Sequence, residues 1–151
     1  MGINEAQIME GDDTMIIVSA CLAGINCTYN GETQEHEQIV ELVKKGQAIV
    51  VCPEQLGGLT TPRVPAEIQE GRVITKESKD VTDAFIKGAV EGLSICNKYG
   101  CIEAILKSKS PSCGCGLIYD GTFTGKLIKG DGITTRLLKE NGIKVVSSDE
   151  I

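Results

Sequence analysis

Three short apolar runs in this chain each lead into a cysteine that lies among turn residues. The runs are residues 15–20, 48–51 and 102–106, and the cysteines that follow them are Cys21, Cys52 and Cys113. Short apolar runs bounded by Gly and Pro predict buried strands. In an open parallel sheet the carboxyl ends of neighbouring strands border one crevice, where ligands bind. The three thiols can therefore meet around one metal ion or cluster; the alternative is three separate core thiols.

Segments with helical spacing separate these strands. Apolar residues recur at helical spacing over residues 39–43 and 81–96, and again over 133–138, which a strand at 143–146 follows. Four strands that alternate with helices predict an α/β, three-layer Rossmann-like fold with a small, mainly parallel sheet of about four strands. Residues 72–75 are predicted to add a short edge strand.

Length and charge restrict the class of protein. Residues 1–13 show no apolar period and are predicted to be a mobile tail, and residues 14–151 to be a single α/β domain. The formal net charge of −6 argues against a nucleic-acid partner, which would need a basic face. No apolar run approaches the roughly 20 residues of a membrane span, and no signal peptide is evident. We expect a cytoplasmic protein with a small-molecule ligand.

The seven cysteines indicate which metal the site would hold. In a reducing compartment they are expected to be ligands, catalysts or core residues rather than disulfides. Cys96 and Cys101 fit a buried core, whereas the positions of Cys27 and Cys115 are ambiguous. Thiolates with a single histidine in the chain favour zinc or an iron–sulfur cluster. Because paired Cys-x-x-Cys knuckles are lacking, the larger cluster suits the pattern better.

Several polar residues accompany these cysteines. Glu54 is a candidate general acid or base, or a helix-start residue. Ser110 could donate a hydrogen bond to a ligand, although Ser-Pro-Ser is also common turn chemistry. Arg63 could compensate thiolate charge, grip an anionic group or stand on the surface. Residues 53–67 are too rich in Gly and Pro for regular structure and form a second candidate site region, while Gly114 could let the backbone approach a bulky inorganic group.

Several motifs follow one another in a recognisable order. They are SACLAG, YNGE, VCPEQLGGL, TPR, KDVTDAF, ILKSKSPSCG, IYDGTFTG and GDGITTRLLKENGI, and they extend from about residue 15 to residue 146. This set resembles the thiouracil desulfidase (TudS) family, first catalogued as a domain of unknown function. The resemblance covers nearly the whole chain.

The resemblance implies a cofactor, an activity and a set of site residues. Cys21, Cys52 and Cys113 would hold a [4Fe-4S] cluster with one iron not ligated by protein. The implied reaction is non-redox removal of sulfur from a thiolated pyrimidine, such as 2-thiouracil, to give uracil and sulfide. Glu54 would move protons, and Ser110 would orient the substrate or stabilise developing charge.

Two thiols leave an alternative open. Cys27 lies just before the Tyr-Asn-Gly turn, where many relatives carry a basic residue, and Cys115 is an additional thiol beside Cys113. If either closed the fourth iron, the chain would be a non-catalytic zinc or iron–sulfur protein with a four-thiolate site, serving structure or redox sensing.

Overall fold

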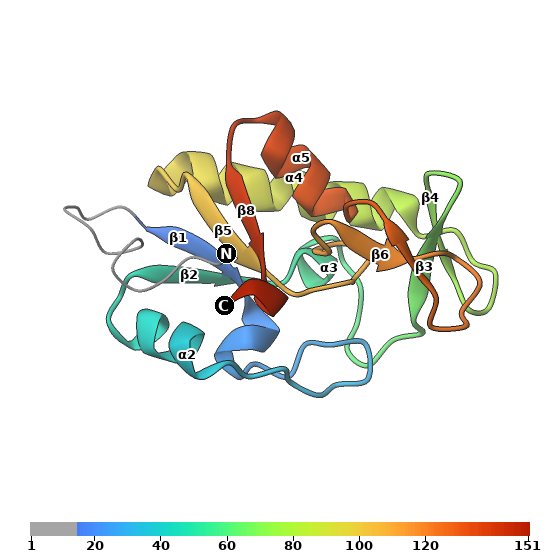
Figure 1. Cartoon of the computed structure of the whole chain (residues 1–151), viewed down its shortest axis with the longest axis horizontal. Helices are drawn as coiled ribbons and strands as arrows, with labels where there is room; N and C mark the ends of the chain where they lie inside the picture. The colour runs from blue at the N-terminus through green and yellow to red at the C-terminus, as the bar shows by residue number, and fades with distance from the viewer. Residues whose placement is uncertain (1–14) are drawn as a thin grey trace.

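The computed structural model describes residues 15–151, so the predicted tail at residues 1–13 lies outside the described residues. The elements follow one another from β1 at the start to η2 at the end (Figure 1). They are β1 (Ile16–Ser19), η1 (Ala20–Ala23), α2 (Glu37–Lys44), β2 (Ala48–Val51), α3 (Pro53–Leu56), β3 (Ala66–Gln69), β4 (Arg72–Thr75), α4 (Thr82–Tyr99), β5 (Glu103–Leu106), β6 (Leu117–Tyr119), β7 (Leu127–Lys129), α5 (Ile133–Glu140), β8 (Lys144–Ser147) and η2 (Ser148–Glu150).

The main sheet has four parallel strands in the order β2-β1-β5-β8. Side chains alternate between its two faces, so Ile16 and Val18 pack with α2 while Ile17 packs with α4 and α5. Helices α4 and α5 cover one face and α2 the other (Figure 1). This arrangement confirms the predicted three-layer α/β fold. No helix within residues 15–151 is long and apolar enough to cross a membrane.

Two small hairpins differ from the predicted elements. Residues 72–75 form the predicted short strand, β4, but it pairs with β3 in an antiparallel hairpin and not with the main sheet. Strands β6 and β7 form a second hairpin that was not predicted. The segment 53–67 also begins with a helix and ends in β3, contrary to the expectation that it lacks regular structure. Pro53 stands at the first helical position, where its missing N–H costs nothing.

Helix α3 packs backbone to backbone on α4. A Cβ atom added to Gly88 would collide with the carbonyl oxygen of Pro53, and one added to Gly57 would collide with the carbonyl oxygen of Ala84. Both glycines are therefore required for this close approach. The contact fixes α3, and with it Cys52 and Glu54, against the long helix.

We predict that Gly88→Ala lowers the free energy of unfolding by about 1–3 kcal/mol, because the added methyl group pushes α3 away from α4. Gly92→Ala in the same helix is the matched control, since its Cβ would meet only ordinary contact with Thr134 at 3.9 Å. The control should leave stability unchanged or raise it by up to about 1 kcal/mol. Urea unfolding of both variants measures the difference, and equal effects would contradict the packing argument.

Candidate active site

A pocket of about 460 Å³ opens at the carboxyl ends of β2, β1 and β5. Ser19, Val51 and Lys107, at or next to those strand ends, contribute to its wall. The five residues that the sequence singled out all line it, and they are Cys21, Cys52, Glu54, Ser110 and Cys113. The structure thus brings together side chains that are separated by up to 92 positions in the chain, counted from 21 to 113.

Cys21 and Cys52 are each held by a short helix that follows a strand. Cys21 is buried in η1, and its carbonyl oxygen accepts hydrogen bonds from the Thr33 hydroxyl at 2.7 Å and the Gln34 backbone N–H at 3.0 Å. Cys52 is the N-cap residue of α3, where its carbonyl accepts from the Leu56 N–H at 2.9 Å. Both thiols are therefore carried by residues whose backbone carbonyl oxygens are hydrogen-bonded.

The turn that carries Cys113 is docked on the start of α5. Helix α5 has Gly132 as its N-cap and no side-chain cap. Its first N–H groups instead donate to the turn, from Ile133 to Pro111 at 2.8 Å and from Thr134 to the Ser112 carbonyl at 2.9 Å. These bonds satisfy groups that a helix N-terminus otherwise leaves unpaired. The docking holds the Cys113 turn in place.

Ser110 and Thr135 fix the same turn through side-chain contacts. The Ser110 hydroxyl oxygen accepts from the Cys113 N–H at 2.7 Å, and the Thr135 hydroxyl donates to the Cys113 carbonyl at 2.8 Å. A Cβ on Gly114 would lie 2.7 Å from the Ser110 carbonyl oxygen. Packing within the turn therefore already requires glycine at 114, whether or not an inorganic group approaches it.

Glu54 forms a part-buried ion pair. Its Oε2 lies 3.1 Å from Nη2 of Arg63, and the two side chains are 19% and 8% exposed. Arg63 is thus not the surface cation that its Gly- and Pro-rich segment allowed. The sequence left open whether Arg63 binds an anionic group and did not identify Glu54 as its partner, because no local pattern marks an arginine as buried.

The thiols interact with one another. The Cys27 side chain neighbours those of Cys21 and Cys52, and the Cys52 thiol donates to the Cys27 carbonyl at 3.8 Å. Hydrogen bonding to Cys21 raises the pKa of Cys27 to about 11. Hydrogen bonding to Cys27, together with burial, raises the pKa of Cys52. Burial raises the pKa of Cys113 to about 11. The pocket therefore favours the protonated forms of Cys27, Cys52 and Cys113.

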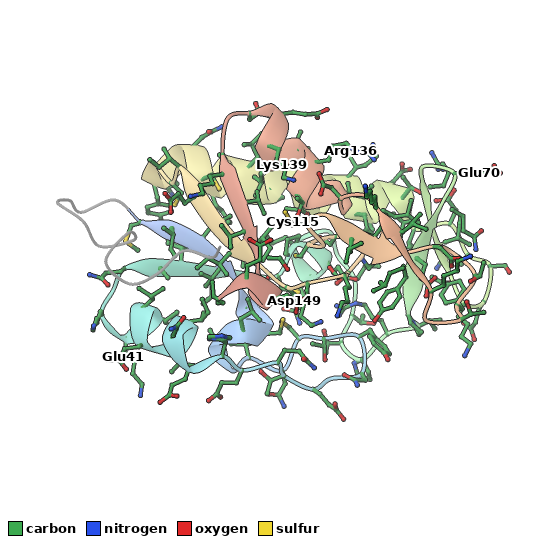
Figure 2. All side chains as sticks on the ribbon, viewed as in Figure 1. Glu41, Glu70, Cys115, Arg136, Lys139 and Asp149 are labelled. Atoms are coloured by element: carbon green, nitrogen blue, oxygen red, sulfur yellow. The ribbon has the colours of Figure 1, made fainter. Side chains whose placement is uncertain are left out.

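The remaining cysteines lie elsewhere. Cys96 and Cys101 are buried in the core between the sheet, α4 and α5, as predicted. Cys115 donates to the Val145 carbonyl at 3.6 Å and lies beside Lys139 of α5 (Figure 2). It is not among the pocket residues. Of the two ambiguous thiols, Cys27 therefore adjoins the candidate ligands.

The donor set has the chemistry of a thiolate-bound cofactor. Four cysteine thiols face one pocket, and no histidine is among the residues that line it. Within residues 15–151, no three His, Cys, Asp or Glu side chains are gathered closely enough to hold a single metal ion. Soft thiolates suit iron–sulfur clusters and zinc rather than hard cations. The pocket residues therefore fit an iron–sulfur cluster.

Comparison with known proteins agrees with this geometry. The family model described as 2-thiouracil desulfurase matches residues 16–150. The chain belongs to the 2-thiouracil desulfurase family. It is similar to the uncharacterized protein YbbK of Bacillus subtilis (strain 168), with 44% identity over 147 residues, covering 91% of this chain and 97% of the relative.

A solved structure of the same family superposes on this chain. It is a [4Fe-4S]-dependent thiouracil desulfidase, TudS, which is 44% identical, with a TM-score of 0.87 and coverage of 91% of this chain and 93% of TudS. The family resemblance inferred from the motifs is thereby confirmed.

We predict that the metal-free chain loses stability as the pH rises from 9 to 11. The folded state raises the pKa of Cys113 from 9.0 to about 11, so it retains a proton that the unfolded chain releases. The raised pKa therefore contributes about 3 kcal/mol to the free energy of unfolding below pH 9, and this contribution is lost as the pH approaches 11. Urea unfolding in chelator and reductant at pH 8 and pH 10.5 measures it. The fall in the free energy of unfolding between the two pH values should be smaller in Cys113→Ala. A fall equal to that of the wild type would show that Cys113 is not its source.

Proposed function

We propose that this chain is an iron–sulfur-dependent desulfidase that removes sulfur from a thiolated pyrimidine such as 2-thiouracil, giving uracil and sulfide. The observation that carries the proposal is the grouping of Cys21, Cys52 and Cys113 with Glu54 and Ser110 in one pocket. Membership of the 2-thiouracil desulfurase family and the similarity to TudS support it.

The proposed cofactor is a [4Fe-4S] cluster held by Cys21, Cys52 and Cys113, with one iron not ligated by protein. When bound, such a cluster supplies a soft Lewis acid that suits the sulfur of a thiocarbonyl group. The position of these three cysteines after the ends of three neighbouring strands, in one pocket, supports this assignment. Cluster loading requires loss of the thiol protons, so we expect it to be favoured by higher pH.

Glu54 and Ser110 are the proposed catalytic residues. The Glu54 carboxylate lines the pocket and can take a proton from the water that replaces sulfur, then return it to the departing hydrosulfide. The Ser110 oxygen is already engaged as an acceptor from the Cys113 N–H, so its own O–H is directed to another partner. We assign that donor to the substrate, where it orients the ring or stabilises developing charge. Water is added and hydrosulfide released, so no electron acceptor is needed.

The proposed substrate is a small thiolated base in the cytoplasm. A net charge of −6 is unfavourable for binding a nucleic-acid backbone. The cytoplasm keeps thiols reduced, as a thiolate-bound cluster needs. The family model extends over residues 16–150, which supports treating residues 14–151 as one domain.

The test is metal content and sulfide release from anaerobically reconstituted protein. We expect about four irons and about four acid-labile sulfides per chain, lost when Cys21, Cys52 or Cys113 is changed to serine. Cys115→Ser is the control and should keep its metal, because that thiol contacts Val145 outside the pocket. An iron-loaded chain that releases no sulfide from 2-thiouracil, 4-thiouracil or their nucleosides would end the proposal.

Glu54→Gln should retain iron and lower kcat by about 10²–10⁴-fold, the usual contribution of general acid–base catalysis. Sulfide release under saturating substrate measures this effect. A kcat equal to that of the wild type would remove Glu54 from the proposed mechanism while leaving the cluster assignment in place.

The contact of Cys27 with Cys21 and Cys52 favours a second candidate function, a closed four-thiolate site without catalysis. Cys27→Ser separates the two candidates. An open cluster should keep its four irons and its sulfide release in this variant. Metal loss on removing Cys27 would instead support the structural or redox-sensing alternative.

A further inference from the structure

The Arg63 guanidinium makes contacts around its whole edge. Nε donates to Glu54 Oε1 at 3.4 Å, and Nη2 lies 3.1 Å from Glu54 Oε2. Nη1 donates to the Thr60 carbonyl at 3.1 Å and to the Thr61 hydroxyl at 2.9 Å. Nη2 also donates to the Cys27 carbonyl at 2.9 Å. These contacts match the five N–H groups that a guanidinium offers.

The contacts of Arg63 join three separate segments. The contact with Glu54 reaches the first turn of α3, and the contact with Thr60 reaches the loop before Arg63. The third segment is the loop of Cys27. The Arg63 backbone N–H adds a hydrogen bond of 2.6 Å to the Tyr29 carbonyl in that last loop. The side chain is only 8% exposed, so water competes little for these bonds. Helix α3 and the Cys27 loop both supply residues to the pocket wall.

We infer that Arg63 is a positioning residue for the desulfidase reaction: its fork fixes the Glu54 carboxylate and secures the Cys27 loop beside it. The inference rests on the proposed function, because it assigns Arg63 an effect on turnover through Glu54. A two-point contact restricts the carboxylate in both direction and rotation, which a single charge cannot do. Lysine keeps the charge but lacks the planar fork, so it cannot replace these contacts.

The test compares Arg63→Gln and Arg63→Lys with Glu54→Gln in anaerobically loaded protein. We expect Arg63→Gln to keep the wild-type iron content and KM while kcat falls about 100-fold, as for other losses of alignment. The kcat of Arg63→Lys should lie between those of Arg63→Gln and the wild type. Arg72→Gln is the matched control, since Arg72 forms an exposed pair with Asp80 at 2.9 Å and should keep wild-type turnover.

A double-mutant cycle distinguishes positioning from a general structural role. If Arg63 acts through Glu54, adding Arg63→Gln to Glu54→Gln should lower kcat little further. The inference would be overturned if the loss of kcat in the double variant equalled the product of the two single losses. A wild-type kcat in Arg63→Gln would overturn it as well. If the wild-type chain itself releases no sulfide, or Glu54→Gln is fully active, the proposed function of Glu54 fails instead.

Hydrogen–deuterium exchange supplies a readout that does not depend on turnover. In Arg63→Lys we expect faster amide exchange in residues 27–31 and 53–57, the segments that the guanidinium joins. The Arg72→Gln control should match the wild type in both segments. Unchanged exchange in Arg63→Lys would show that the fork does not secure these segments, and it would overturn the inference even if the variant could not be assayed.

Discussion

The parallel register of β2, β1 and β5 is the constraint on which the site depends. Val18 of β1 is paired with Val50 of β2 and with Ile105 of β5, so the three strands end at the same edge of the sheet. Each strand leads directly into the loop or short helix that supplies a thiol. A slip of one residue would reverse the faces of a whole strand and move its cysteine away from the pocket. Burial on both faces of the sheet opposes such a slip.

Backbone contacts then determine where each loop lies above that edge. The α3 helix approaches α4 at two glycines, and the Cys113 turn receives the first N–H groups of α5. These contacts involve main-chain atoms, which have little freedom to adjust. The proposed ligands and catalytic side chains therefore belong to segments that the fold holds in place. This is the preorganisation that a catalytic site requires, because misplaced groups lose most of their effect.

The strands and the location of the three cysteines in one pocket followed from the sequence because both rest on strong, short-range patterns. Apolar runs ended by turn residues mark strands, and parallel topology brings their ends together. The β6–β7 hairpin was missed because strands of three residues carry too little alternation to be recognised. The burial of Arg63 was also missed, because it depends on the carbonyl of Cys27, 36 positions away. Long-range contacts of this kind leave no local signal.

The proposed cofactor is a thiolate-held iron–sulfur cluster with one iron open to a small substrate. The most direct measurement is a Mössbauer spectrum of ⁵⁷Fe-reconstituted protein, recorded with and without 2-thiouracil, with hydrosulfide measured in the same sample. We expect one iron in about four to differ from the others and to change when 2-thiouracil is added, with sulfide released. A spectrum that is unchanged by 2-thiouracil in a chain that releases no sulfide would contradict the claim, as would a chain that binds zinc and no iron.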